Sequence, residues 1–149
     1  MLKCSKAMSF EHFFSNFYTT GYTGKRVEQL PVLLDYYDAI LADIRFAPVS
    51  RHLQWTKNYL ALMLKDRYRH LPALGNRNYK THGGPIQIHN LEVGIRLIQS
   101  WERNVILLCA CENLENCHRR IIKIALETRG CEVEELTSWD TSQPSLFGA

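Results

Sequence analysis

The segment 105–129 constrains the fold more than any other part of this chain of 149 residues. An apolar run, Val105–Leu108, ends at two cysteines and gives way to a polar loop. The chain resumes as Cys117-His118-Arg119 and continues as an apolar stretch of helix length. A buried strand, a loop and a helix in this order form the repeating unit of parallel sheets. Ligands gather where such strands end, and a helix N-terminus there attracts anions and lowers thiol pKa values.

The rest of the chain alternates in the same way. Apolar or β-prone runs predict strands at 17–21, 39–45, 68–74, 105–111 and 132–136. Helical spacing of apolar residues predicts helices over about 27–37, 50–66, 91–101 and 117–129. We expect Pro31 to bend or shorten the first helix and Ser50 to cap the second. The expected fold is one three-layer α/β domain over 1–149, with a mainly parallel sheet of about five strands and helices on both faces. Expected core residues of the last two helices are Trp101, Ile121, Ile122 and Ala125.

Length and composition agree with one globular domain. Apolar residues make up 46% and charged residues 22% of the chain, as in typical globular proteins. The longest apolar runs, Tyr59–Leu64 and Val105–Cys111, are far shorter than the roughly 18 residues of a membrane span. We expect no membrane partner, a cytoplasmic location, an N-terminal extension over 1–16 and a loose tail over 140–149. Five unevenly spaced cysteines indicate reduced thiols.

The positive charge is concentrated in one part of the sequence. The net charge is +3, but the segment 45–80 holds eight Lys or Arg residues and one acid, Asp66. Clustered positive charge attracts anionic partners. A solvated basic surface without a partner is the alternative interpretation.

The predicted strand ends carry most of the unusual side chains. In a parallel sheet these ends share one edge, so the loops that follow them converge. The loops supply the candidate site residues Gly21, Tyr22, Asp43, Arg45, Ser50, Arg51, Gly75, Arg77, Cys109, Glu112, Cys117, His118 and Arg119. We therefore predict a pocket at the carboxyl edge of the sheet.

Four blocks occur in a specific order along the chain. They are Thr19-Thr20-Gly21-Tyr22, Asp43-Ile44-Arg45 with Pro48 and Ser50-Arg51, the segment Tyr68–Gly75, and Cys109 followed by Cys117-His118-Arg119. The set resembles the bacterial and archaeal family called domain of unknown function 488, over about residues 17–136. The resemblance implies a compact α/β domain with these motifs around one pocket, and it implies no established activity. This chain departs from the family at Cys111, inserted before Glu112, and at Asn76, where a second glycine is common.

In the first functional interpretation the pocket is a thiol-dependent active site. Cys117 would be the nucleophile or a stabilised thiolate beside His118, and Asp43 or Glu112 would orient a base or a guanidinium. The ligand would be a nucleotide or another phosphorylated small molecule. Residues expected to bind it are Gly21, Tyr22, Arg45, Ser50, Arg51, Gly75, Arg77, Cys109, Glu112 and Arg119.

Two alternatives need no catalysis. In one, the segment 45–80 binds nucleic acid, with bases stacked on aromatic rings. The residues involved would be Arg45, Arg51, Lys57, Arg67, Arg69, Arg77 and Lys80, with Tyr22, Trp55 or Tyr79 for stacking. In the other, Cys117 and His118 cap the last helix and Arg119 pairs with Asp43, so the motif is purely structural.

No cofactor is predicted, and zinc is the one metal to consider. Cys109, Cys111, Cys117 and His118 give the four nitrogen and sulfur ligands that zinc takes. Adjacent residues at a helix start are expected to diverge, however, which disfavours convergence of Cys117 and His118. A tyrosine-phosphatase loop is excluded because no arginine stands at the sixth position after any of the three cysteines. Sulfur transfer of the rhodanese type is disfavoured because Ala110–Asn116 contains no glycine.

Overall fold

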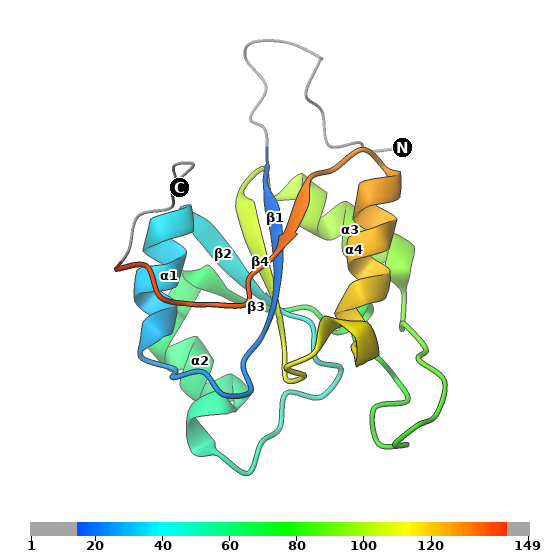
Figure 1. Ribbon diagram of the computed structural model, residues 1–149, viewed down its shortest axis with the longest axis horizontal. Coiled ribbons are helices and arrows are strands. Elements are labelled where there is room, and N and C mark those ends of the chain that lie inside the picture. Colours follow the sequence, from blue (N-terminus) through cyan, green and yellow to red (C-terminus); the bar gives the residue numbers. More distant parts are fainter. Residues whose placement is uncertain (1–14, 143–149) are drawn as a thin grey trace.

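The computed structural model describes residues 15–142, which form one α/β domain around a parallel sheet (Figure 1). The strands are β1 (Phe17–Gly21), β2 (Ala39–Asp43), β3 (Tyr68–His70), β4 (Asn104–Cys109) and β5 (Val133–Glu135). They follow the order β3-β2-β4-β1-β5, and every neighbouring pair is parallel. The predicted fold class is confirmed. The predicted extension over 1–16 and the predicted tail over 140–149 lie largely outside the described residues.

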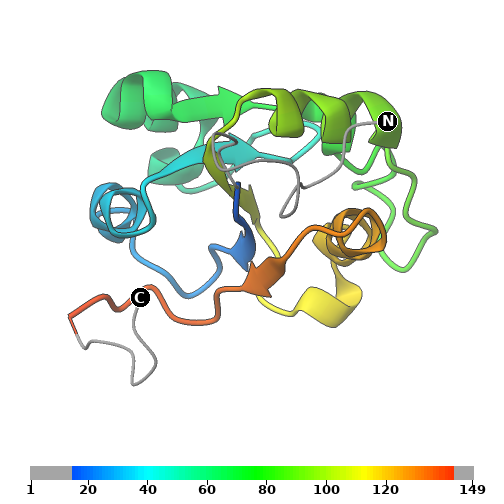
Figure 2. The same ribbon diagram turned by 90° about the horizontal axis from the view of Figure 1, so that it is seen from above.

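Helices cover both faces of the sheet. They are α1 (Gln29–Tyr37), α2 (Lys57–Leu64), α3 (Leu91–Ser100) and α4 (Arg119–Thr128). In Figure 2 α1 and α2 lie on one side of the sheet, and α3 and α4 on the other. Strand β4 contributes to the core on both faces of the sheet because its side chains point alternately to one face and to the other. Leu107 and Cys109 pack in the core under α3 and α4, whereas Ile106 and Leu108 pack in the core under α1 and α2.

Several predicted elements end or begin at other residues, and two of these differences have a clear physical cause. Strand β3 stops at His70, and Pro72–Leu74 forms a 3-10 turn, because proline cannot donate a hydrogen bond to a neighbouring strand. Helix α2 begins at Lys57, and Thr56 caps it by accepting a hydrogen bond from Tyr59 N. The prediction of Ser50 as the cap is therefore wrong.

Pro31 does not interrupt the first helix, which continues to Tyr37. It lies in the first turn of α1, where a backbone N–H has no partner within the helix and none is lost. Within the described residues, no helix is long and apolar enough to cross a membrane.

The carboxyl ends of the strands point to the bottom of Figure 1, where the connecting loops gather. Two close backbone approaches bring these loops together. A Cβ atom on Gly21 would lie 1.6 Å from the carbonyl oxygen of Cys111, so the end of β1 touches the loop after β4. A Cβ atom on Gly75 would lie 2.5 Å from Cα of Phe46. Glycine at both positions allows an approach that any side chain would block.

Candidate functional site

A cavity of about 430 Å³ opens at the carboxyl edge of the sheet. The loops after β1, β2 and β4 and the segment 76–86 form its walls. It is lined by Tyr22, Arg45, Phe46, Ala47, Val49, Asn76, Asn78, Tyr79, Thr81, His82, Gly83, Gly84, Ile86, Cys109, Ala110, Cys111, Asn116 and His118. This set contains one arginine and two histidines but no carboxylate. Its volume falls in the range of small-molecule sites, about 300–1,000 Å³.

Two thiols and an imidazole meet beside this cavity, which Cys109 and His118 line and Cys117 does not. The sulfur atoms of Cys109 and Cys117 are 2.7 Å apart, and Cys117 Sγ lies 3.7 Å from Nδ1 of His118. The three ligand atoms all lie within 4.8 Å of one another, and all three residues are buried. The expectation that Cys117 and His118 diverge is wrong. Helix α4 starts only at Arg119, so the two residues belong to the turn before it, where neighbouring side chains can converge.

A backbone hydrogen bond orients the His118 ring. Nε2 lies 2.8 Å from the carbonyl oxygen of Ile44, and because a carbonyl only accepts, Nε2 carries the proton. The lone pair of Nδ1 then faces the Cys117 thiol. Burial lowers the pKa of His118 and favours the neutral ring. His118 makes no side-chain cap on α4, so the capping role suggested for it is wrong.

Arg119 is fully buried, and all five of its N–H groups have partners. Nε and Nη2 bind the two carboxylate oxygens of Glu135 at 3.1 and 2.7 Å. Nη1 donates to Cys109 Sγ at 3.2 Å and to the Cys111 carbonyl at 2.7 Å, and Nη2 donates to the Glu112 carbonyl at 3.0 Å. The suggested pairing of Arg119 with Asp43 is therefore wrong. No donor of Arg119 remains for the anion that it was predicted to bind.

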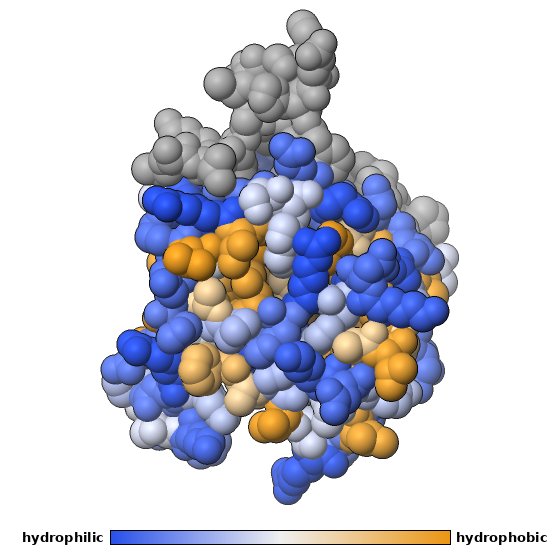
Figure 3. Space-filling model, turned by 180° about the vertical axis from the view of Figure 1, so that it is seen from behind, coloured by the Kyte–Doolittle hydropathy of each residue, from blue (hydrophilic) through white to orange (hydrophobic). Residues whose placement is uncertain are grey.

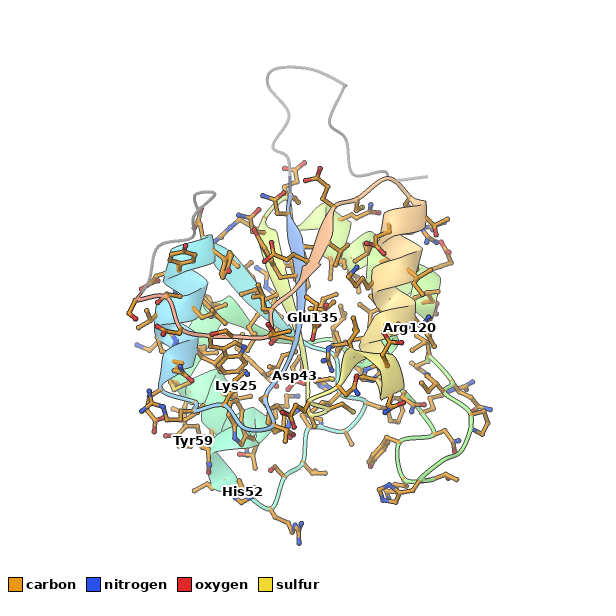
Figure 4. The ribbon with its side chains drawn as sticks, in the orientation of Figure 1. Lys25, Asp43, His52, Tyr59, Arg120 and Glu135 are labelled. Carbon is orange, nitrogen blue, oxygen red and sulfur yellow. The ribbon has the colours of Figure 1, made fainter. Side chains whose placement is uncertain are left out.

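Asp43 instead pairs with Arg45, as their spacing along the strand suggests. Arg45 Nε and Nη2 bind the two oxygens of Asp43 at 2.8 and 2.6 Å, and Nη1 donates to Trp55 O at 2.7 Å. The Tyr68 hydroxyl donates to Asp43 at 2.5 Å. Burial, followed by the charge of Asp43, raises the pKa of Tyr68. In Figure 4 Asp43 lies inside the molecule near the strand ends, well away from His52 in the loop after β2.

The thiols of Cys111 and Cys117 differ in acidity. A hydrogen bond from Cys109 lowers the pKa of Cys117, but a hydrogen bond to Cys111 and burial outweigh it and raise that pKa to about 11. Hydrogen bonds from Cys109 and Cys117 lower the pKa of the exposed Cys111 to about 2. The prediction of a lowered pKa at Cys117 is therefore wrong. Cys109, Cys111 and Cys117 are free thiols, whereas Cys131 is disulfide-bonded and departs from the expectation of reduced cysteines.

The other predicted site residues divide into two groups. Tyr22 lines the cavity, and Gly21 and Gly75 allow the loops to meet. Ser50, Arg51, Arg77 and Glu112 do not line it; Ser50 accepts a hydrogen bond from His52 N, and Arg77 N donates to Gln87 O.

The basic segment 45–80 does not form a single positive face. Arg67 pairs with Asp35 of α1, whereas Arg69 lies over the Trp101 ring next to α3. Trp55, suggested for base stacking, is buried and stacks on Tyr22 with ring centroids 4.3 Å apart. On the face seen in Figure 3, apolar side chains form several separate patches among hydrophilic ones.

Some residues of the site could not be found from the sequence. Glu135 binds Arg119, and Tyr68 donates to Asp43, the partner of Arg45, yet each stands on an edge strand in an ordinary setting. Phe46 and Asn116 line the cavity through loop conformation, and Tyr79, which was suggested for base stacking, lines it as well. The one sequence signal for the thiol cluster is the occurrence of Cys111 close to Cys109 and Cys117.

Comparison with known proteins adds no assignment. No protein-family model matches the sequence, and no curated protein and no solved structure matches it. The resemblance to the domain of unknown function 488 family stays a prediction.

Proposed function

We propose that the protein binds a zinc ion through Cys109, Cys117 and His118 and presents it to a small molecule in the adjoining cavity. The observation that carries the proposal is the convergence of two thiols and an imidazole beside a cavity of suitable size. Zinc takes cysteine sulfur at about 2.3 Å and histidine nitrogen at about 2.0–2.1 Å. Three protein ligands with an open fourth position are typical of catalytic zinc sites, whereas structural sites have four.

The distances fit a tetrahedral site after one small movement. With those bond lengths a sulfur and a nitrogen ligand lie about 3.6 Å apart, and two sulfurs about 3.8 Å apart. Cys117 Sγ and His118 Nδ1 are 3.7 Å apart, close to the first value. The sulfurs of Cys109 and Cys117, at 2.7 Å, have to separate by about 1 Å. Rotation about the side-chain bonds of two cysteines can supply a change of this size.

Groups around the cluster match those that surround zinc ligands in proteins. A metal-bound histidine commonly donates its other ring N–H to a carbonyl or carboxylate, which fixes the tautomer. His118 Nε2 makes this bond to Ile44 O. Arg119 donates to Cys109 Sγ, and a hydrogen bond from a guanidinium stabilises a negative thiolate. The imidazole is thus in the neutral form that a metal needs, whereas the raised pKa values of Cys109 and Cys117 mean that zinc would displace a proton from each thiol.

Electrostatics favour a metal over the phosphate group considered from the sequence. Glu135 and Asp43 already neutralise Arg119 and Arg45, and both arginines are buried. A phosphate in the cavity would have to compete with those carboxylates for the same donors. A divalent cation, by contrast, would compensate the charge of two buried thiolates. The phosphorylated, nucleotide or nucleic-acid partner therefore stays a prediction with less support than the metal.

The test is metal content after equilibration with zinc under reducing conditions and gel filtration. We expect one zinc per chain in the wild type, and loss of tight binding in Cys109→Ser, Cys117→Ser and His118→Ala. The matched control is His70→Ala, because His70 Nε2 also contacts a backbone carbonyl, Arg45 O at 2.9 Å, but lies outside the cluster. This variant should keep its zinc. A reduced, folded wild type that holds no stoichiometric zinc would contradict the proposal.

A further inference from the structure

Cys109 and Cys117 form a pair of buried thiols whose spacing suits a second kind of bond besides those to zinc. Their sulfur atoms lie 2.7 Å apart, and both residues are buried. Two zinc-bound sulfurs would lie about 3.8 Å apart, whereas the sulfurs of a disulfide lie about 2.0 Å apart. The observed separation falls between these values. A movement of about 0.7 Å would therefore allow the two sulfurs to form a disulfide bond.

The backbone at both cysteines is held by hydrogen bonds. The Cys109 carbonyl accepts a hydrogen bond from Tyr22 N at 3.0 Å, which fastens the end of β4 to the loop after β1. Cys117 N donates to Leu114 O at 3.1 Å, and Cys117 O accepts from Arg120 N at 3.1 Å. Rotation about the side-chain bonds can therefore bring the sulfurs together or separate them while the backbone stays in place.

The two thiols differ in their surroundings. Cys109 lines the cavity, whereas Cys117 does not. Arg119 Nη1 donates to Cys109 Sγ at 3.2 Å, and Cys117 Sγ lies 3.7 Å from His118 Nδ1. A hydrogen bond from a guanidinium stabilises a thiolate, and an accessible thiolate is the form that peroxides oxidise. A small oxidant in the cavity would therefore react first with Cys109, and Cys117 is close enough to complete a disulfide.

We propose, on the basis of the zinc site proposed above, that Cys109 and Cys117 are also an oxidation site, which hydrogen peroxide converts to a disulfide with release of the zinc. The Cys109 thiolate attacks one peroxide oxygen, the O–O bond breaks, and the departing hydroxide takes up a proton to become water. The Cys117 thiolate then attacks the sulfur of the resulting Cys109 sulfenic acid, the S–O bond breaks, and the second hydroxide also becomes water. The two sulfurs lose two electrons, the peroxide gains them, and two protons are consumed.

Release of zinc follows from the loss of its ligands. Zinc binds cysteine as the thiolate, and the sulfurs of a disulfide carry no negative charge. Of the three ligands in the cluster only His118 would remain. The zinc-bound and oxidised forms are therefore mutually exclusive, and reduction of the disulfide restores both thiols. The metal content of the site thus depends on the redox state of its cysteines.

The experiment treats the zinc-loaded full chain with a small molar excess of hydrogen peroxide, and a chromogenic chelator that leaves the untreated protein loaded reports free zinc. We expect release of one zinc per chain, with loss of two alkylatable thiols and two hydrogen atoms from the tryptic peptide 104–119. Removal of peroxide by catalase, followed by dithiothreitol, should restore the thiols and zinc binding. The matched variant is Cys111→Ser, which removes the third thiol of that peptide and keeps the three ligands. It should respond as the wild type does.

The outcomes separate this proposal from the zinc site itself. If Cys111→Ser binds one zinc and retains it in peroxide, the oxidation proposal is wrong and the zinc site stands. Release of zinc without a disulfide in the peptide 104–119 has the same meaning. A disulfide that forms in the wild type but not in Cys111→Ser would involve Cys111 and would also contradict the proposal. If the reduced wild type holds no zinc, the zinc site and the redox control that rests on it both fail.

Discussion

Two buried arginines at the same edge of the sheet perform different tasks. Arg45 and Arg119 both hold a carboxylate through two N–H groups, and both are almost inaccessible to solvent. The further partners of Arg45 are oxygens, those of Tyr22 and Trp55. The further partners of Arg119 are Cys109 Sγ and two carbonyls of the loop that carries the thiols.

The difference shows how one kind of ion pair can serve the fold or the site. Arg45 fastens the loop after β2 to the sheet on the side of α1 and α2. Arg119 fastens the loop after β4, and with it the orientation of Cys109 and Cys111, on the side of α3 and α4. Removing one partner of a buried pair leaves an uncompensated charge and costs about 3–5 kcal/mol. Replacing either arginine should therefore lower the stability of the fold by a similar amount. Only the replacement of Arg119 should weaken metal binding.

Replacing each arginine by methionine should give the largest effects. We expect Arg45→Met and Arg119→Met each to lower the free energy of unfolding by about 3–5 kcal/mol in denaturant titrations. Zinc affinity of the folded protein should fall about 10–100-fold in Arg119→Met, as is usual when a group that supports metal ligands is lost. Arg45→Met should bind zinc as the wild type does. Equal zinc affinities in the two variants would show that Arg119 does not support the cluster.

Replacing each of the two closely packed glycines by alanine compares the loop after β4 with the loop after β2 in a second way. Gly21→Ala places a methyl group against the Cys111 carbonyl, and Gly75→Ala places one against the Phe46 backbone. Overpacking of this kind costs about 1–3 kcal/mol, measurable by thermal and denaturant unfolding. Gly21→Ala should also weaken zinc binding because the thiol loop must shift, whereas Gly75→Ala should not. If Gly75→Ala weakened zinc binding more than Gly21→Ala, the loop after β4 would have no part in metal binding.

A change at Tyr68 should affect the ion pair of Arg45 and not that of Arg119. Its hydroxyl donates to buried Asp43, and a hydrogen bond to a charged group contributes about 1.5–3 kcal/mol. The pKa of Tyr68 is raised, first by burial, so the stability from this group is fully present below about pH 10 and is lost as pH rises through the folded pKa. We expect Tyr68→Phe to be less stable at pH 7 and to lose less stability than the wild type between pH 9 and pH 11. Parallel stability curves for the two proteins would refute this account.

An exposed ion pair should give the smallest effect. Arg67 and Asp35 are 32% and 74% exposed, and such surface pairs contribute about 0–1 kcal/mol. Asp35→Asn should therefore leave unfolding and zinc content nearly unchanged at moderate salt. A loss as large as that expected for Arg45→Met would mean that burial does not set the energetic difference among these pairs.

The sequence was a good guide to the sheet because its signal is local. Apolar runs such as Val105–Leu108 identify strands, and each predicted strand is present; β1 has the predicted bounds, and the other four differ from theirs by a few residues. The cavity at the carboxyl edge follows from the same order of elements. The partners of the site residues do not, because they depend on side chains that meet across the fold. Arg119 pairs with Glu135, 16 residues later, and the convergence of Cys117 and His118 depends on where α4 begins.

The most direct test of the metal site is X-ray absorption at the zinc edge of the reconstituted wild type. We expect a first shell containing at least two sulfurs at about 2.3 Å and a histidine nitrogen at about 2.0–2.1 Å. Cys117→Ser should lose one sulfur from that shell, and His70→Ala should retain it. A wild-type shell of oxygen and nitrogen alone would contradict the account, because zinc would then lie away from Cys109 and Cys117.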